Sequence, residues 1–340
     1  MPVLDGEGLV RGVRGADRRA IARAITLVES SHPDHQSAAA DLLDRLAQAP
    51  GQALRIGLSG APGVGKSTFI ESFGTFLVDR GHKIAVLAVD PSSAVSGGSI
   101  LGDKTRMERL AVDPRAYIRP TPSGTSLGGV ARRTRETIRI VEAAGFDVVV
   151  VETVGVGQSE AAVAAMTDIF VLLLSPGAGD ELQGIKRGIV ELAHVALVNK
   201  TDGDLADEAR RTAAEYRNAF RMLAGGGAGW KVEVHTCSAL TGAGISEAWE
   251  CIERYREWYE STGARSRRRS EQARGWLWSE IADSIRATIE SREDLKRLVE
   301  SMEEDVAAGK TSAAAAARRV ISAAFETTPT KTSSRQERDQ

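Results

Sequence analysis

Short runs of apolar residues recur along the middle of the chain, and a stretch with helical periodicity follows each run. The runs are nearly continuous in Val, Ile and Leu, which is typical of strands buried on both faces of a parallel sheet. Strands that alternate with helices predict an α/β fold, with a mainly parallel sheet covered by helices on both faces. The predicted strands are Leu54–Ser59, Ile84–Val89, Asp147–Val151, Ile169–Leu174, Val195–Val198 and Val232–Thr236.

Helical patterns flank this central region on both sides. Residues 9–48 have apolar positions at helical spacing, and no strand pattern remains after about Gly263. The helical segments after that point lie near 271–291, 293–308 and 311–325. We therefore predict an N-terminal helical segment (1–50), an α/β nucleotide-binding domain (51–263), a C-terminal helical arm (264–326) and a disordered polar tail (327–340).

Composition narrows the class of protein. The chain has 340 residues, of which 42% are hydrophobic, and its 44 Lys and Arg balance 46 Asp and Glu. That balance argues against a dedicated nucleic-acid binder. No apolar run reaches the roughly 18 residues of a membrane span. Two cysteines cannot form a disulfide framework. The N-terminal arginines alternate with acidic residues, so we expect a cytoplasmic protein, with a processed mature form as the alternative.

A complete phosphate-binding motif follows the first predicted strand. The sequence from Gly60 to Ser67 matches G-x-x-x-x-G-K-[ST], and a helical pattern follows it. Inward-pointing backbone N–H groups and the helix N-terminus would bind phosphates, with Lys66 on the β- and γ-phosphates and the Ser67 hydroxyl on Mg²⁺. The predicted phosphate-binding residues are Gly60, Ala61, Pro62, Gly63, Val64, Gly65, Lys66, Ser67 and Thr68.

Acidic residues end two other predicted strands. Glu152 suits a role on Mg²⁺, and Asp90 suits orientation of the attacking water or a metal-bound water. The alternatives are a structural carboxylate at Glu152 and a turn-initiating Asp90 before proline. The Gly155 N–H is placed to reach the γ-phosphate. The next residue is Val156, where Ras-like proteins have a water-positioning glutamine, so we expect slow intrinsic hydrolysis.

Two later segments predict recognition of a guanine base. Asn199-Lys200-Thr201-Asp202 has the pattern N-K-x-D, in which the Asp202 carboxylate can accept the N1–H and 2-amino protons of guanine. Adenine lacks these donors and would leave the charge unpaired, so GTP is expected rather than ATP. The Lys200 stem can cover the base, and Asn199 can connect this loop to the phosphate loop. Ser238 and Ala239 follow the last predicted strand, where a backbone N–H can meet guanine O6.

Three longer segments give the sequence a more specific resemblance. Residues 86–107, 152–160 (Glu-Thr-Val-Gly-Val-Gly-Gln-Ser-Glu) and 176–186 (Pro-Gly-Ala-Gly-Asp-Glu-Leu-Gln-Gly-Ile-Lys) resemble the MeaB/ArgK family of P-loop GTPases. That family comprises G-protein chaperones of methylmalonyl-CoA mutase and includes the human cobalamin-A-type protein. The resemblance extends over about 10–325.

The resemblance implies a partner, an assembly and several moving segments. It implies a GTPase that binds an adenosylcobalamin-dependent acyl-CoA mutase, gates cofactor loading, protects the mutase and dimerises partly through the C-terminal arm. It also implies switch segments at 92–108, 153–160 and 177–188. Lys186 would be a mobile catalytic cation, although alone it reads as a solvated helix lysine. Arg106 is a nucleotide-binding switch candidate. Which acyl-CoA mutase is the partner stays open.

Other classes of protein fit the sequence less well. A nickel-inserting GTPase needs a set of metal ligands, but the chain has no Cys-x-x-Cys and its five histidines are scattered in sequence. A transport-linked kinase would need a site for a protein substrate, which no motif marks. A protein-targeting GTPase normally has a Met-rich domain, and this chain has 5 Met. The scattered histidines are His32, His35, His82, His194 and His235.

Overall fold

The computed structural model describes most of the chain, in two compact units. The described residues are 6–30, 32–47, 52–89, 107–121, 127–153, 160–177, 187–223 and 229–325. The first unit contains residues 1–272 and the second residues 273–340, so helix α12 (Ala264–Ser291) belongs partly to each. The segment boundaries predicted from the sequence stay predictions, and the predicted disordered tail lies outside the described residues.

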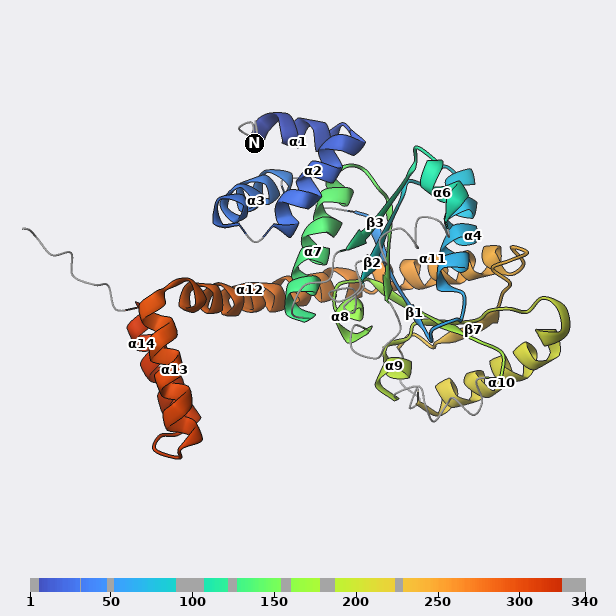
Figure 1. Ribbon diagram of the computed structural model, residues 1–340. Helices are drawn as coiled ribbons and strands as arrows, with labels where there is room; N and C mark the ends of the chain where they lie inside the picture. The colour runs from blue at the N-terminus through green and yellow to red at the C-terminus, as the bar shows by residue number, and fades with distance from the viewer. Residues whose placement is uncertain are drawn as a thin grey trace, which may run out of the picture. The chain divides into compact units, whose positions relative to one another are not determined.

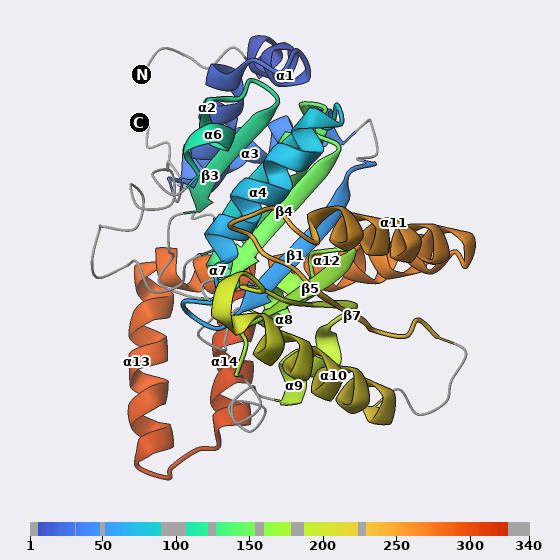
Figure 2. The ribbon, with the colours of Figure 1, turned by 90° about the vertical axis from the view of Figure 1, so that its right-hand side faces the viewer.

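A parallel sheet of seven strands forms the centre of the first unit (Figures 1 and 2). Its order is β3-β2-β4-β1-β5-β6-β7, so β1 lies between β4 and β5. The predicted α/β fold is confirmed. The strands are β1 (Leu54–Gly60), β2 (Ile84–Val89), β3 (Ala116–Thr121), β4 (Val148–Thr153), β5 (Ile169–Leu174), β6 (Val195–Val198) and β7 (Glu233–Thr236).

Strand β3 is the one that the sequence pattern does not predict. Its segment, Ala-Tyr-Ile-Arg-Pro-Thr, has Arg119 and Pro120 where a buried strand would continue its apolar run. The strand lies at the edge of the sheet, beside β2. Proline is tolerated in an edge strand because one side of that strand has no neighbour that needs its N–H. The interruption therefore hides this strand from a periodicity argument.

Helices cover both faces of the sheet, as predicted. On one face lie α4 (Lys66–Asp79), α6 (Glu108–Val112) and α11 (Ile245–Ser261). On the other lie α7 (Leu127–Ala143), α8 (Glu160–Ala164), α9 (Arg187–Leu192) and α10 (Ala206–Leu223). Alternation along the strands supplies both faces: Leu173 packs under α4 and α11, whereas Leu172 packs toward α9 and α10.

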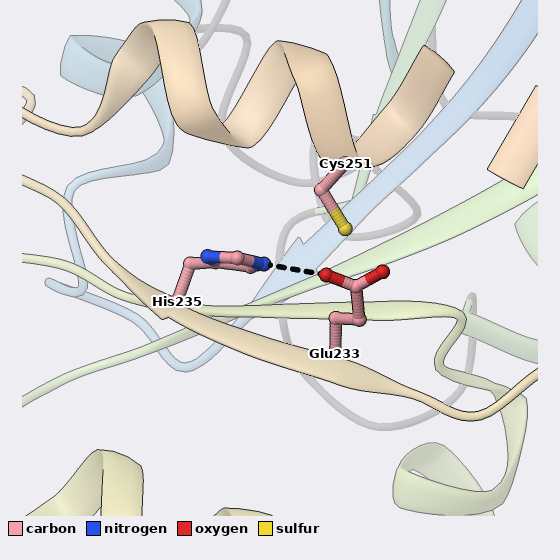
Figure 3. Close-up of side chains that lie close together, drawn as sticks. All are labelled: Glu233, His235 and Cys251. Carbon is pink, nitrogen blue, oxygen red and sulfur yellow. Dashed lines mark hydrogen bonds and ion pairs between the residues drawn. The ribbon is translucent and has the colours of Figure 1, made fainter. Parts of the chain in front are cut away.

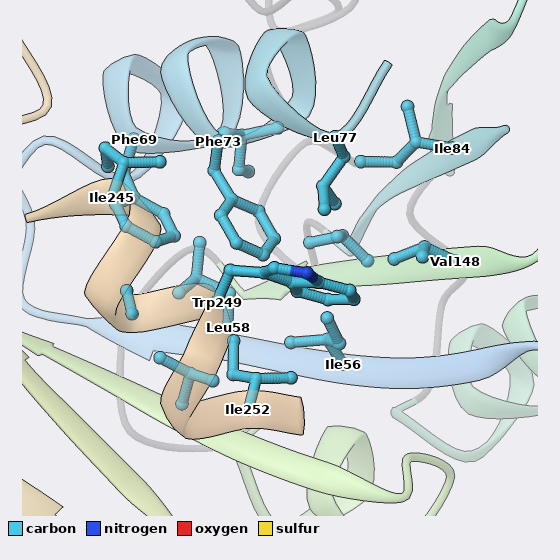
Figure 4. Close-up of a cluster of buried hydrophobic side chains, with 14 of the residues drawn as sticks. Ile56, Leu58, Phe69, Phe73, Leu77, Ile84, Val148, Ile245, Trp249 and Ile252 are labelled. Atoms are coloured by element: carbon cyan, nitrogen blue, oxygen red, sulfur yellow. The ribbon is translucent and has the colours of Figure 1, made fainter. Parts of the chain in front are cut away.

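The larger core cluster lies where α4 and α11 meet over the sheet. Trp249 of α11 packs against Phe73 of α4, with 5.9 Å between the ring centroids, and faces Ile56 of β1 (Figure 4). All three side chains are almost fully buried. Burial of such large apolar groups stabilises each by roughly 1.5–3 kcal/mol, so this cluster holds the helix that follows the phosphate loop firmly on the sheet.

Three helices precede the sheet and pack on its outer helical layer. They are α1 (Gly6–Arg14), α2 (Arg18–Glu29) and α3 (Pro33–Leu46), and each contacts α7. Asp17 caps α2 by accepting the Arg19 N–H at 2.9 Å. Glu29 forms a 2.5 Å ion pair with Arg119 of β3. The helical N-terminal segment is therefore attached to both α7 and the edge strand.

A charged network forms at the amino ends of β1 and β5. Asp168, which is 1% exposed, accepts two hydrogen bonds from the Arg269 guanidinium at 2.6 and 2.9 Å. It also accepts the Arg55 backbone N–H at 3.0 Å. The Arg55 side chain in turn pairs with Glu142 of α7 at 2.7 Å. Burial opposes the charge of Asp168, but Arg269 outweighs it and holds the pKa of Asp168 below its usual value.

The second unit is helical throughout its described residues. Besides the rest of α12 it contains α13 (Glu293–Ala307) and α14 (Ala313–Phe325), which pack as a hairpin around Met302, Ala316 and Val320. Three large apolar side chains of α12 are exposed: Leu277, Trp278 and Ile281. Within the described part of the chain, no helix is both long and apolar enough to span a bilayer.

Candidate functional site

The phosphate loop connects the central strand β1 to helix α4. Gly65 is the residue before α4, with a positive φ of 95°, and Gly63 has a φ of 78°. A side chain on Gly65 would also meet the Asn199 amide nitrogen at 2.7 Å, and one on Gly60 would meet the Leu173 carbonyl oxygen at 2.4 Å. Only glycine allows this backbone path and these contacts. The loop therefore has the shape that the motif predicts.

Lys66 begins α4 and is held within the loop. Its Nζ donates hydrogen bonds to the carbonyl oxygens of Gly60 at 2.7 Å and Ala61 at 3.2 Å. Desolvation lowers the pKa of Lys66, while the nearby charges of Glu152 and Glu160 act in the opposite direction. Ser67, on the next position of α4, is partly buried. The structure thus brings Lys66 and Glu152 together at the carboxyl ends of the central strands.

Two buried carboxylates stand near this lysine. Glu152, near the end of β4, is 7% exposed and lies in register with Leu58 of β1. Glu160, 3% exposed, begins α8. Glu160 is not among the site residues predicted from the sequence. The available signal was its place at the end of the Glu152–Glu160 motif, but only the fold shows that its charge reaches Lys66.

Asn199 joins the phosphate loop to the predicted base-recognition loop. Its amide nitrogen donates to the Val64 carbonyl at 2.9 Å, and its amide oxygen accepts the Ala239 N–H at 2.9 Å. The Asn199 side chain is buried, and its two partners lie 135 residues before it and 40 residues after it in the sequence. This is the connection between loops that the N-K-x-D pattern predicts.

Asp202 and Ser238 also meet across these two segments. The Ser238 hydroxyl donates to Asp202 Oδ1 at 2.5 Å and accepts the Thr241 N–H at 3.1 Å. Lys200 is exposed and has a positive φ of 61°, a left-handed conformation that is uncommon for residues other than glycine. The turn at Lys200 separates buried Asn199 from the Asp202 carboxylate. Asn199 can therefore contact the phosphate loop while Asp202 contacts Ser238.

Four predicted site residues lie outside the described part of the chain. They are Asp90, Arg106, Gly155 and Lys186. Most of the three predicted switch segments is likewise outside it. The described part of the predicted site therefore comprises the phosphate loop with Lys66, Ser67 and Thr68, the strand-end Glu152, and the predicted base-recognition residues around Asn199 and Ser238.

Comparison with known proteins identifies the family. A profile of the family described as methylmalonyl-CoA mutase-associated GTPase MeaB matches residues 21–294. The chain belongs to this family. The sequence resemblance is thereby confirmed. As a MeaB-family protein, the chain is a GTPase.

Relatives and a solved structure agree with the MeaB assignment over nearly the whole chain. A Caulobacter vibrioides relative with a GTPase name is 52% identical over 323 residues, covering 95% of this chain and 99% of the relative. A Mus musculus relative named as a mitochondrial methylmalonic aciduria type A homolog is 44% identical, covering 93% and 78%. The crystal structure of an LAO/AO transport system kinase has a TM-score of 0.74 at 36% identity, covering 95% and 98%.

A separate group of metal-ligating side chains lies between β7 and α11. Glu233 and His235 of β7 approach Cys251 of α11, and the imidazole Nε2 lies 3.0 Å from a Glu233 carboxylate oxygen (Figure 3). In the sequence, His235 is one of five scattered histidines. The available signal was the Glu-x-His spacing, which puts two ligands on one face of a strand. The cysteine comes from a helix 16 residues later in sequence, so only the fold shows the group.

Proposed function

We propose that this GTPase is a chaperone of an adenosylcobalamin-dependent acyl-CoA mutase, with methylmalonyl-CoA mutase as the first candidate. It would gate cofactor loading and protect the mutase. The observation that carries the proposal is the match of residues 21–294 to a family described as associated with that mutase. The name of the mouse relative, which refers to methylmalonic aciduria, supports the same assignment.

The site residues take distinct roles in this proposal. The loop from Gly60 to Thr68 binds the phosphates, and Lys66 contacts the β- and γ-phosphates. Asn199 positions the base loop, in which Asp202 selects guanine. Ala239, whose N–H is held by Asn199, and Ser238 complete that loop. The further nucleotide contacts proposed from the sequence are Lys200, Arg106 and Gly155.

A Mg²⁺ ion fits the oxygen donors at the phosphate end. Ser67 offers a hydroxyl and Glu152 a buried carboxylate, and hard oxygen ligands of this kind suit Mg²⁺. Asp90 is the third proposed ligand. The ion would supply positive charge to the phosphate oxygens during transfer. In the same region burial lowers the pKa of Lys66, and the charges of Glu152 and Glu160 partly offset that lowering.

Val156, the residue after Gly155, is the reason to expect that a partner protein stimulates hydrolysis. Val156 cannot orient a water molecule, so the proposed basal rate is low. Lys186 is proposed to approach the nucleotide when the mutase is bound. A cation added to the transferring phosphoryl group contributes about 10³–10⁵ in rate in other nucleotide-hydrolysing proteins.

The decisive experiment is steady-state GTP hydrolysis with and without purified methylmalonyl-CoA mutase from the same organism. We expect a large acceleration that saturates at a fixed ratio of the two proteins. Lys186→Ala should keep basal hydrolysis and lose most of the acceleration, with Lys231→Ala, at an exposed lysine, as a control. Absence of both acceleration and complex formation would reject this mutase as the partner and leave the GTPase assignment intact.

A kinase is the second candidate function, because the related crystal structure carries the name of a transport system kinase. GTP labelled at the γ-phosphate distinguishes the two. A GTPase releases the label as inorganic phosphate, whereas a kinase leaves it on a protein. Label retained on a protein substrate at the rate of GTP consumption would favour the kinase.

The proposed homodimer has a candidate surface on α12. Leu277 and Ile281 are 59% and 38% exposed and lie one turn apart, beside Trp278 at 71%. We propose that a second copy of the chain covers this face. Trp278→Lys should convert the dimer to a monomer in light scattering, whereas Met222→Lys, at an apolar residue of α10 that is 84% exposed, should not. A wild-type monomer would contradict the proposal.

A further inference from the structure

Strand geometry directs Glu233 and His235 to the same side of the sheet. In the register with β6, Glu233 is opposite Val195 and His235 is opposite Leu197. Both of these β6 residues belong to the core under α11, whereas Val234 belongs to the core under α10. Because side chains alternate along a strand, Glu233 and His235 face α11.

Helix α11 presents Cys251 to that pair. Cys251 is fully buried, in the stripe of α11 that also carries Ala248 and Ile252. The ligand atoms of the thiol, the imidazole and the carboxylate all lie within 4.8 Å of one another. Figure 3 shows the Cys251 sulfur above the Glu233 carboxylate, with the His235 ring beside it. Three donors from two elements thus converge on one point.

The donor set is the one that zinc prefers. Thiolate, imidazole and carboxylate are each common Zn²⁺ ligands, and three protein ligands leave one position for water. A mixed set of sulfur and nitrogen donors does not suit Mg²⁺ or Ca²⁺, which prefer oxygen. The group therefore differs in chemistry from the oxygen donors of the phosphate site.

The surroundings orient the ligands and leave a path to solvent. The Arg254 guanidinium donates to the Glu233 carboxylate at 2.7 Å, one turn of α11 beyond Cys251. Hydrogen bonding of this kind orients ligating carboxylates in metal sites. A cavity of about 290 Å³ borders His235 and is also lined by Thr201 and Glu247. An ion can therefore reach the imidazole from solvent.

We propose that Glu233, His235 and Cys251 bind one Zn²⁺ ion per chain and thereby fasten the edge strand β7 to α11. The strand leads directly into Cys237–Ala239, where the Ala239 N–H is bonded to Asn199. A bound ion would thus hold the strand that supports the base-recognition loop. The site is independent of the proposed mutase partner.

Metal titration of the full-length, GDP-bound protein tests the site. Chelator-treated protein is titrated with Zn²⁺ against a competing chromophoric chelator, and separately with Co²⁺. We expect one tight equivalent of Zn²⁺ and, with Co²⁺, the charge-transfer absorption of a cobalt–thiolate bond. Cys251→Ser should remove that absorption, and His235→Gln should abolish stoichiometric binding. His32→Gln, at a histidine that lies beside His35 and outside the proposed site, should change neither.

Each result decides the proposal. Binding of Zn²⁺ that is weak or substoichiometric would overturn it and leave the group as an Arg254–Glu233 ion pair with two neighbours. Retention of one tight equivalent in both variants would also overturn it, because the ion would then lie elsewhere. Far-ultraviolet circular dichroism shows whether each variant is folded. If a variant does not fold, the cobalt spectrum of the wild type still answers the question.

Discussion

The two ends of the parallel sheet are built in different ways. At the carboxyl ends of the strands, the nucleotide site uses runs of consecutive residues, 60–68, 199–202 and 237–239, and most contacts involve the backbone. At the amino ends, the single Asp168 side chain accepts the Arg269 guanidinium, 101 residues away in sequence, and the Arg55 backbone N–H, 113 residues away. The first end is the proposed nucleotide site, whereas the second holds the first turns of α12.

This difference predicts that mutations at one end of the sheet change mainly nucleotide binding, and that mutations at the other end change mainly folding stability. The phosphate loop and the base-recognition loops depend on glycines and polar residues in a fixed order. Substitutions there should alter nucleotide binding and leave folding stability nearly constant. A buried ion pair needs one residue on each side, so changes there should alter stability and leave base selection constant. A variant that changed nucleotide affinity and the free energy of unfolding to the same extent would contradict this prediction.

Asp202→Asn should have the largest effect. The carboxylate proposed to accept two guanine protons becomes an amide that can pair with xanthine, so the ratio of GTP to XTP affinity should fall by about 10⁴-fold. Competition binding with both nucleotides measures the ratio. Asp204→Asn, an exposed neighbour two residues away, is the matched control. Unchanged rejection of xanthine nucleotides would remove Asp202 from base recognition.

Asp168→Asn should destabilise the first unit by about 3–5 kcal/mol, because it leaves the Arg269 charge without its buried partner. Chemical denaturation followed by tryptophan fluorescence measures the free energy of unfolding. Asp41→Asn breaks the exposed pair with Arg45 and should cost under about 1 kcal/mol. Equal losses in the two variants would contradict the role given to the amino-end network.

Lys66→Ala should lower kcat/KM for GTP by about 10²–10³-fold, since one preorganised cation is lost from the phosphates. The unfolding free energy should change little by comparison with Asp168→Asn. Lys83→Ala, at an exposed lysine before β2, should leave GTP hydrolysis unchanged. Full activity in Lys66→Ala would place the phosphate contacts elsewhere in the loop.

His194 gives the smallest predicted effect, and it depends on pH. Its Nδ1 accepts the Phe170 N–H at 3.0 Å, and burial lowers the pKa of His194 to about 3. As the pH falls, His194 of the unfolded chain, with a pKa near 6.5, binds a proton before His194 of the folded protein does. The contribution of His194 to the free energy of unfolding is therefore fully present above pH 6.5 and is lost progressively as the pH falls toward 3. Between pH 6.5 and 5.5 the loss should be about 1 kcal/mol.

His194→Asn isolates that contribution. Asparagine keeps an acceptor near the position of Nδ1 but does not titrate in this range. We expect the unfolding free energy of the wild type to fall more steeply than that of the variant below pH 6.5, in denaturation curves collected at each pH. Parallel pH dependences would show that the folded protein binds the proton as readily as the unfolded chain.

Much of the fold and the nucleotide site could be predicted because the relevant patterns are local. The phosphate motif brings its own turn, since Gly63 and Gly65 allow positive φ and Lys66 begins the helix. The hydrogen bond from Asn199 to the phosphate loop joins residues that are 135 positions apart, but it was expected because the N-K-x-D pattern that predicts it is itself a run of four neighbouring residues. Glu160 was not selected, because nothing in its local sequence shows that its charge reaches Lys66.

The sequence by itself determined the alternation of strands and helices, the phosphate loop and the guanine-recognition segments, because periodicity and contiguous motifs are written in neighbouring residues. Tertiary structure alone decided three other features: the edge strand β3, the network of Asp168 with Arg269, and the meeting of Cys251 with Glu233 and His235. In each case the partners come from separate elements. Sheet order and helix packing, rather than spacing along the chain, bring them together.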